Sequence, residues 1–232
     1  MAFIAGADGC KFGWLCITEE VDTGKIDSKV YRTAQDLFTQ TPEPILYAID
    51  IPIGLNETGP RLCDIQAREL LGNRRSSVFP APIRPALHAN NRAEADAIRR
   101  KIESRGVSSQ SFGIYHKVAE VDEFLTSSSN TAIKEVHPEL CFWAWNNQKA
   151  MSSSKKKIKG LFERHRLVAE YFGEEAIEMA RERHLVKDVA LDDIYDAFAA
   201  LWTAKRIHKK IARRIPEPVI VDKKGLSMEM WY

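Results

Sequence analysis

Apolar segments of strand length alternate with longer segments of helical periodicity along this chain, a pattern typical of α/β proteins. Residues 3–8 and 14–18 are mostly apolar, and the short segment between them contains two glycines, which predicts two strands joined by a tight turn. A third strand is predicted at residues 26–31. Residues 45–51 form a nearly continuous apolar run, as in strands covered on both faces. The beginning of the chain therefore predicts an antiparallel meander followed by a buried strand.

Helical patterns dominate the rest of the chain, and start and stop signals mark most of their boundaries. Residues 60–71 begin with proline and are followed by glycine, the asymmetry expected of a helix. Repeated prolines exclude a regular helix from residues 74–85. The predicted helices are residues 34–38, 60–71, 92–105, 139–145, 160–184 and 191–214, the further strands are residues 131–136 and 218–221, and the loops include residues 74–85 and 126–130.

Two acidic residues interrupt the apolar strands. Asp8 ends the first strand, and Asp50 lies inside the buried one. An ionised carboxylate in such a place is costly unless it is paired or binds a metal. Asp8 has an alternative role as a turn residue that accepts backbone N–H groups beside Gly9. Asp50 has apolar residues on both sides, so a functional role is favoured for it.

The last long helix contributes further carboxylates near its start. At 100° per residue, Asp193 and Asp196 fall on the same face as Ala197 and Ala200. Small residues let this face lie close against the sheet, so both aspartates are expected to point toward the sheet's end. The alternative is that acids here only cap the helix and favour its dipole. We assign that role to Asp192, whereas Asp196 lies one turn further in.

Asp8, Asp50, Asp193 and Asp196 thus form a predicted group of carboxylates drawn from two strands and one helix. Hard divalent cations such as Mg²⁺ prefer oxygen ligands of this kind. Two ions about 3.5–4 Å apart can activate a water and stabilise a leaving oxygen in phosphodiester cleavage. Without a metal, the same carboxylates would raise one another's pKa values. The pattern therefore predicts metal-dependent phosphodiester chemistry with Mg²⁺ or Mn²⁺.

Short segments around these residues resemble one known family. They are residues 6–14, 49–55, 61–64, 67–68, 76–82, 135–139 and 192–197. Together they are similar to the domain-of-unknown-function 429 family, a group predicted to be RNase H-like nucleases. The i, i+3 pair of Asp193 and Asp196 resembles the RuvC branch of that superfamily. The matching segments extend from the first strand to the last helix, so the resemblance covers most of the chain.

The resemblance implies an α/β fold with an RNase H-like mixed five-stranded sheet flanked by helices. It implies one domain over residues 1–232, with an inserted helical and loop region at about residues 56–130. A metal-dependent nuclease is the activity expected, with DNA or RNA as its partner. One departure is Phe12, where the family is expected to have glycine, and this should change only the hairpin.

The end of the strand at residues 131–136 carries two further candidates. His137 is a candidate to position a water or to act as a general base, and Glu135 is a candidate metal ligand. The alternative is a simple strand-to-helix turn, with Pro138 at the helix start and Glu139 in its first turn. Both interpretations stay open at this point.

The overall charge of +2 excludes a polycation, so nucleic-acid binding would depend on local basic patches. Basic residues near the proline-rich loop and in the loop at residues 155–159 are the main phosphate-binding candidates. For residues 155–159 the alternative to phosphate binding is an ordinary solvated loop. For the basic residues at the end of the last helix, the alternative is that they complement the helix dipole. The predicted nucleic-acid-binding residues are Lys11, Arg61, Arg68, Arg74, Arg75, Arg84, Lys155, Lys156 and Lys157.

Composition limits the classes of protein that remain. The 232 residues are 44% hydrophobic and 28% charged, which excludes a disordered chain. No apolar run is long enough to span a bilayer, and no secretory signal is expected at the start. The four cysteines include no C-x-x-C pair, so a reduced cytoplasmic protein with buried thiols is predicted.

Two other functions compete with the nuclease. An actin-like ATPase or phosphotransferase would use the turn after Asp8 for phosphate and Asp50 for the metal, but the chain is short for two such domains and lacks a G-K-[ST] loop. A non-catalytic nucleic-acid-binding module would keep the fold without the chemistry. The presence of all four aspartates argues against loss of the site.

Overall fold

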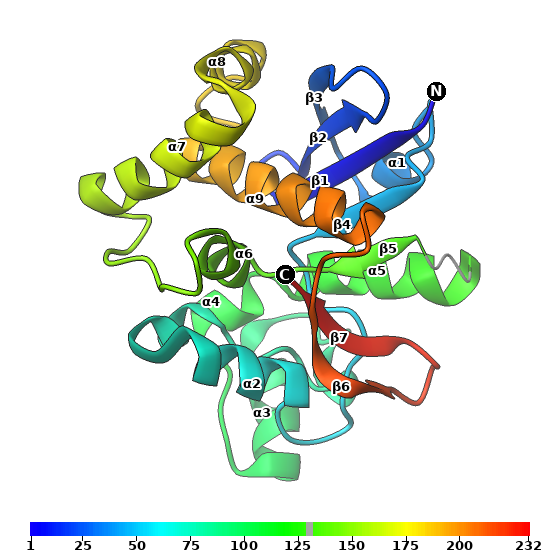
Figure 1. Cartoon of the computed structure of the whole chain (residues 1–232). Helices are drawn as coiled ribbons and strands as arrows, with labels where there is room; N and C mark the ends of the chain where they lie inside the picture. Colours follow the sequence, from blue (N-terminus) through cyan, green and yellow to red (C-terminus); the bar gives the residue numbers. More distant parts are fainter. Residues whose placement is uncertain (129–131) are drawn as a thin grey trace.

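A mixed five-stranded sheet forms the centre of the protein in a computed structural model that describes residues 1–128 and 132–232 (Figure 1). Strands β1, β2 and β3 are antiparallel neighbours, whereas β4 and β5 run parallel to β1. The α/β class and the mixed sheet are therefore confirmed, and the strand order is consistent with an RNase H-like fold. The strands in spatial order are β3 (Ile26–Tyr31), β2 (Trp14–Glu20), β1 (Phe3–Gly9), β4 (Leu46–Ile49) and β5 (Ile133–Glu135).

Helices cover both faces of this sheet (Figure 1). On one face, α9 (Leu191–His208) lies across β1 and β4 and is backed by α6 (Pro138–Trp145), α7 (Ile158–Phe172) and α8 (Glu174–Arg183). The other face is covered by α1 (Ala34–Phe38) and α5 (Tyr115–Ser128). The chain between β4 and α5 forms α2 (Leu62–Leu71), η1 (Gly72–Ser77), η2 (Arg84–Ala86), α3 (Arg92–Glu103) and α4 (Ser109–Phe112).

Gly6 lets α9 approach β1 more closely than any other residue would. A Cβ atom at Gly6 would lie 2.1 Å from the backbone nitrogen of Leu201 and 2.4 Å from the carbonyl oxygen of Ala197. Because strand side chains alternate between faces, Gly6 and Asp8 share the face that α9 covers. The contact at Gly6 therefore brings the start of α9 toward the carboxyl end of β1.

The helical content of the insertion is higher than predicted. Residues 126–130 were expected to form a loop, but α5 continues to Ser128. The hydroxyl groups of Ser127 and Ser128 donate to the carbonyl oxygen of Phe124, so these polar side chains are satisfied within the helix. Residues 129 and 130, including the predicted end of the insertion, lie outside the described residues. The predicted loop at residues 74–85 contains parts of η1 and η2.

The C-terminal region differs from its predicted form. The last helix ends at His208 rather than near residue 214, because Lys210 adopts a positive φ of 58° that a helix cannot continue. The strand predicted at residues 218–221 begins earlier, as β6 (Arg214–Val221), and pairs with β7 (Ser227–Trp231) in a hairpin. A strand at β7 was not predicted, because its apolar run is short.

All four cysteines are buried and none forms a disulfide, which agrees with the predicted buried thiols. Among the helices of the described chain, none combines the length and apolar character needed to cross a lipid bilayer. The expected cytoplasmic location stays a prediction.

We predict that Gly6→Ala lowers the free energy of unfolding by about 3 kcal/mol, because the methyl group would overlap backbone atoms that cannot rotate away. Urea denaturation followed by circular dichroism measures this change. Gly113→Ala is the matched control, since the nearest heavy atom to a Cβ there is 3.3 Å away. Equal stability of the two variants would show that α9 does not depend on the contact at Gly6.

Candidate functional site

Two predicted aspartates lie side by side at the ends of adjacent parallel strands. The register pairs Ala7 with Ile49, so Asp8 and Asp50 follow at the same level. The backbone N–H of Asp50 donates to the carbonyl oxygen of Ala7 at 3.0 Å. Because side chains alternate, Asp50 shares the α9 side of the sheet with Ala48, just as Asp8 shares it with Gly6. The alternation of each strand thus directs both carboxylates toward the start of α9.

Asp193 and Asp196, in the first two turns of α9, complete this group of carboxylates. Asp8 and Asp196 are buried, with 6% and 1% of their surfaces exposed. Burial raises the pKa of Asp8 well above its usual range, and the charges of Asp50 and Asp196 raise it further. Burial also raises the pKa of Asp196, to about 6. The structure therefore brings all four predicted aspartates to one end of the sheet, where the charges of Asp50, Asp196 and Asp193 act on Asp8.

A lysine lies among these carboxylates. The ammonium group of Lys155 donates a hydrogen bond to Oδ2 of Asp196 and lies 3.6 Å from Oδ2 of Asp192. Burial disfavours its charge, but the carboxylates of Asp196 and Asp8 outweigh this effect and raise the pKa of Lys155. Lys155 was predicted to contact nucleic acid, with a solvated loop as the alternative. Its side chain forms an ion pair within the carboxylate group here, and its contact with nucleic acid stays a prediction.

Neither acid at the start of α9 has only the role that was expected of it. Oδ2 of Asp193 accepts a hydrogen bond from the backbone N–H of Ala190 at 2.9 Å and so stabilises the helix start. Asp192, which was expected to cap, instead accepts from Lys156 at 2.7 Å. Burial still raises the pKa of Asp193, and its charge contributes to the raised pKa of Asp8. Asp193 is therefore both a helix-stabilising residue and a neighbour of Asp8.

Several carboxylate oxygens in this region have no hydrogen-bond partner. Oδ1 of Asp196 and Oε2 of Glu139 are buried and unpaired among the described residues. The side chains of Asp8 and Asp50 likewise accept no hydrogen bond from the part of the chain that the structure describes. Buried unpaired oxygens carry a large desolvation cost, which a cation would offset. The donor set consists of oxygens alone, the ligand type that a hard divalent cation prefers, but among the described residues no three of this set bring ligand atoms within 4.8 Å of one another.

Glu139 is the residue that sequence analysis missed as a candidate. It is 5% exposed, and its charge is among those that raise the pKa of Asp196. Its Oε1 accepts hydrogen bonds from Arg74, at 3.2 Å, and from the fully buried Arg164. The available signal was its place just after a strand end, but this was also the ordinary position of an acid in a first helical turn.

Glu135 does not join the aspartates. It is paired with Ile49 in the sheet and follows Ile133 by two residues, so it lies on the face opposite α9. Both of its oxygens accept from Arg61, at 2.6 and 2.7 Å. The strand's alternation therefore turns Glu135 away from Asp8, and its role as a metal ligand stays a prediction. Arg61 is 2% exposed and its guanidinium group is engaged by Glu135. The prediction that Arg61 contacts nucleic acid is therefore wrong.

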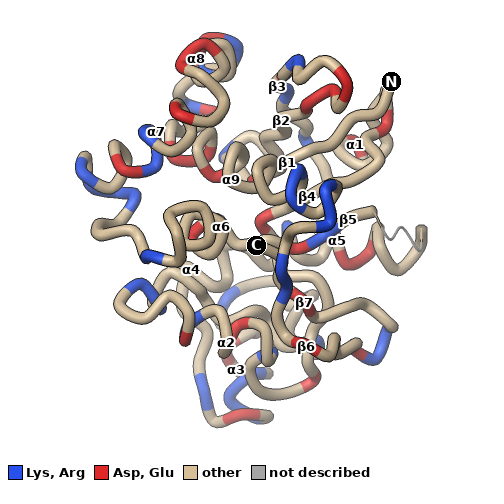
Figure 2. The backbone as a smooth tube through the Cα atoms, viewed as in Figure 1, with Lys and Arg blue, Asp and Glu red and all other residues tan. Residues whose placement is uncertain are grey.

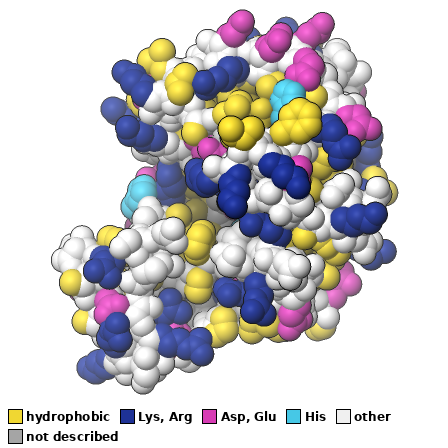
Figure 3. All heavy atoms as spheres, turned by 90° about the vertical axis from the view of Figure 1, so that its left-hand side faces the viewer, with side chains coloured by type: hydrophobic (Ala, Val, Ile, Leu, Met, Phe, Trp, Pro, Cys, Tyr) yellow, Lys and Arg dark blue, Asp and Glu magenta, His cyan; other side chains and the backbone are white. Residues whose placement is uncertain are grey.

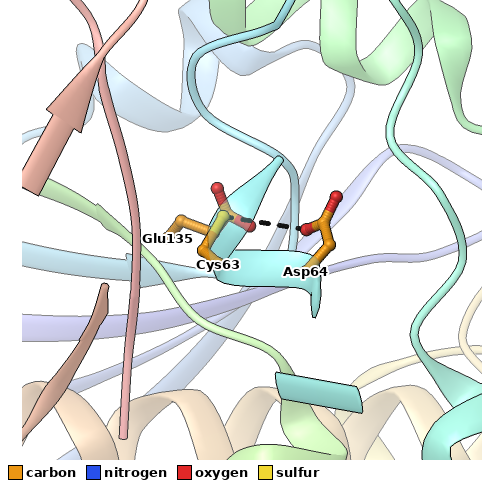
Figure 4. A group of neighbouring side chains, drawn as sticks. All are labelled: Cys63, Asp64 and Glu135. Carbon is orange, nitrogen blue, oxygen red and sulfur yellow. Dashed lines mark hydrogen bonds between the residues drawn. The ribbon is translucent and has the colours of Figure 1, made fainter. Parts of the chain in front are cut away.

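Cys63, Asp64 and Glu135 form a second acidic group on this side (Figure 4). Their ligand atoms lie within 4.8 Å of one another, so the group can hold a metal ion. However, the Arg61 guanidinium contacts both carboxylates, with Asp64 at 2.5 Å and Glu135 at 2.6 Å. Burial raises the pKa of the Cys63 thiol, which keeps it protonated and a poor ligand. A cation here would have to displace a buried guanidinium.

His137 lies at the start of α6 and contacts η1. Its Nε2 is 3.3 Å from the carbonyl oxygen of Ser77, and its Nδ1 is buried without a partner among the described residues. Its predicted role as a general base is neither supported nor excluded by these contacts, and it stays a prediction.

Residues 6–220 match the family described as "Protein of unknown function (DUF429)". The match spans most of the chain. This protein belongs to the DUF429 family. Among curated proteins and among solved structures, none matches the chain significantly. Membership confirms the predicted family and leaves the activity to be inferred from the site.

The remaining basic candidates of this DUF429 protein divide into paired and exposed residues. Arg84 forms ion pairs with Asp122, at 2.9 Å, and with Asp222, so its prediction as a phosphate contact is wrong. Arg74 contacts Glu139. Arg68 donates to a backbone carbonyl and, with Arg75, lines a cavity of about 430 Å³. The candidates that remain exposed are Lys11, Arg75, Lys156 and Lys157.

The raised pKa values predict a pH-dependent stability. Asp8 and Asp196 bind protons more tightly in the folded protein than in the unfolded chain, where the value is near 3.8. Stability in EDTA should therefore fall as the pH rises from about 4 through about 6. Asp8→Asn removes part of this repulsion and should raise the free energy of unfolding at pH 7.5 by about 1 kcal/mol.

Thermal and urea unfolding across this pH range test the prediction. Asp22→Asn is the control, because Asp22 is exposed in the turn at the other end of the sheet. If Asp8→Asn is no more stable than this control and keeps the wild-type pH profile, the aspartates do not repel one another in solution.

Proposed function

We propose that this DUF429 protein is a metal-dependent hydrolase of phosphodiester bonds in nucleic acid. The single observation that carries the proposal is the convergence of Asp8, Asp50 and Asp196 at one end of the sheet, where Oδ1 of Asp196 is buried and has no partner among the described residues. Repulsion between these carboxylates does not stabilise the fold. The presence of the carboxylates therefore favours a functional cation at this place.

Asp8, Asp50, Asp196 and Glu139 are the residues that would hold one or two Mg²⁺ or Mn²⁺ ions. Bound there, such ions supply an activated water and positive charge against the developing charge of the phosphate. Asp193 contributes charge and stabilises the start of α9 through Ala190. Arg164 and Arg74 both donate hydrogen bonds to Oε1 of Glu139 and so position its side chain. Oε2 of Glu139 has no partner among the described residues.

Lys155 would take part in this chemistry as a movable counter-ion. Its ammonium group contacts Asp196, and its side chain is 32% exposed, so it can swing toward solvent without crossing the core. In the absence of a divalent cation it offsets the negative charge of the carboxylates. When a cation binds, the same ammonium group is free to contact a phosphate of the substrate.

The proposal predicts cleavage of single- or double-stranded DNA or RNA in Mn²⁺ or Mg²⁺ and none in EDTA. Asp8→Asn and Asp50→Asn should each lower the cleavage rate by more than roughly 100-fold. Substitutions of residues that only contact metal ligands typically lower activity by roughly 10- to 100-fold. Asp22→Asn should cleave at the wild-type rate. Gel electrophoresis of end-labelled oligonucleotides measures the products.

The same experiment separates the competing functions. Cleavage that is absent with every nucleic acid, or unchanged in Asp8→Asn, contradicts the nuclease. Thermal stabilisation by Mg-ATP but not by oligonucleotides would instead support the ATPase or phosphotransferase. Tight oligonucleotide binding that is indifferent to metal and to Asp8→Asn would support the binding module.

We predict that Lys155→Met tightens Mn²⁺ binding by roughly tenfold, because close charge pairs couple by about 1.5 kcal/mol or more and the competing ammonium group is removed. Isothermal titration calorimetry or electron paramagnetic resonance measures the affinity. Lys156→Met is the control, since Lys156 is 74% exposed and its ammonium group pairs with Asp192. Unchanged affinity in Lys155→Met would show that Lys155 and the cation do not compete.

A further inference from the structure

The first turns of α7 carry apolar side chains on the surface. Ile158 is 88% exposed and Phe162 is 65% exposed. At 100° per residue, Ile158, Lys159, Phe162, His165 and Arg166 fall within about 120° of the helix circumference. We call these five residues the α7 face. An exposed aromatic ring therefore lies between an aliphatic side chain and two basic ones, rather than in an apolar patch of its own.

Four basic residues near or on the α7 face form no ion pair among the described residues, whereas Lys155, Lys156 and Arg164 pair with acids. The four are Lys149, Lys157, Lys159 and Arg166. Residues 149–166 contain seven Lys and Arg residues against one acid, Glu163. Glu163 is engaged by the backbone N–H groups of Ser152 and Ser153, at 3.0 and 3.2 Å. Figure 2 shows basic residues at the start of α7 and in the loop before it, and Figure 3 shows Lys and Arg side chains among hydrophobic ones on this side of the molecule. Such a surface attracts a polyanion.

The exposed ring is held in place. Phe162 stacks on His165, with ring centroids 6.4 Å apart and an angle of 25° between the rings. His165 is fixed in turn, because its Nδ1 is 3.1 Å from the hydroxyl of Tyr195 and its Nε2 is 3.0 Å from Glu174. A ring that is already ordered loses little entropy on binding a partner.

The inner side of α7 is anchored to the carboxylates of the proposed site. Arg164 is fully buried and donates to Glu139, to Gly160 at 2.6 Å and to Ser153 at 3.3 Å. Lys155, which contacts Asp196, precedes Ile158 by three residues, and three residues span at most about 11 Å. The start of the α7 face is therefore close along the chain to a side chain that contacts the carboxylates.

We propose that the α7 face binds single-stranded nucleic acid, with a base stacked on Phe162 and phosphates contacting Lys159 and Arg166. The inference rests on the proposed function, because it names the form of the substrate that the carboxylates would act on. Only unpaired bases can present a face to the ring, so single strands are favoured over duplexes. The cations favour a polyanion over a second apolar surface.

Fluorescence anisotropy of labelled 12-base DNA and RNA strands, and of the matching duplexes, tests the proposal in EDTA, where no cleavage interferes. Single strands should bind at least roughly tenfold more tightly than duplexes. Phe162→Leu, which keeps the apolar surface but removes the ring, should weaken binding at least about fivefold, since stacking contributes about 1–3 kcal/mol per base. Phe162→Trp should retain the wild-type affinity.

Matched variants separate stacking from general stability. Ile158→Ala should weaken binding, whereas Ile45→Ala should not, because Ile45 is 50% exposed just before β4. Lys159→Ala should weaken all single strands alike and lower the slope of affinity against salt by about 1. Sedimentation velocity establishes whether each variant keeps the oligomeric state of the wild type.

Three results would overturn the proposal: wild-type affinity in Phe162→Leu, equal or tighter binding of duplexes, or a dimer that Phe162→Leu dissociates. The last result would assign the α7 face to a second copy of the chain. The two proposals fail separately. Binding through Phe162 without cleavage in Mn²⁺ contradicts the nuclease alone, and cleavage with unimpaired binding by Phe162→Leu contradicts the α7 face alone.

Discussion

The close contact between α9 and β1 determines where the carboxylates lie. At Gly6 the backbones of the two elements touch without a side chain between them. This contact fixes the helix over the strand, so the first turns of α9 lie over the carboxyl ends of β1 and β4. Asp196 then meets Asp8 and Asp50 without any loop to adjust its position. The site is therefore built on rigid elements, which hold ligand geometry better than loops do.

The same arrangement leaves a charge imbalance that the protein only partly offsets. Lys155 is the one cation whose ammonium group contacts Asp196 among the described residues, and the charge of the same lysine also acts on Asp8. On the other face of the sheet, Arg61 pairs fully with Glu135 and Asp64. The contrast separates two buried acidic groups in one fold: one is complete as a structural network, and the other retains unpaired oxygens.

The aspartates could be predicted because their positions follow from local rules. Asp8 and Asp50 interrupt apolar strands, and Asp193 and Asp196 share the alanine face of a helix. The same alternation also placed Glu135 on the face of Ile133, but which face α9 covers could not be decided from the strand itself. The α/β class and the mixed five-stranded sheet followed from the meander, the buried strand and the family resemblance.

The basic residues were the least predictable part. Arg61 and Arg84 lie in a proline-rich region that reads as exposed, yet their partners Glu135 and Asp222 are 74 and 138 residues away in the chain. Pairs so distant in sequence leave no local pattern. Glu139 was missed for a related reason. An acid in the first turn of a helix is ordinary, and only the structure shows that Arg164 and Asp196 are its neighbours.

A crystal soaked in Mn²⁺ and measured for anomalous scattering tests the central claim most directly. The account predicts a peak about 2.0–2.3 Å from carboxylate oxygens of Asp8, Asp50 and Asp196, with the Lys155 ammonium group moved away from Asp196. A peak found only beside Cys63, Asp64 and Glu135, or no peak at concentrations that saturate other manganese enzymes, would contradict it.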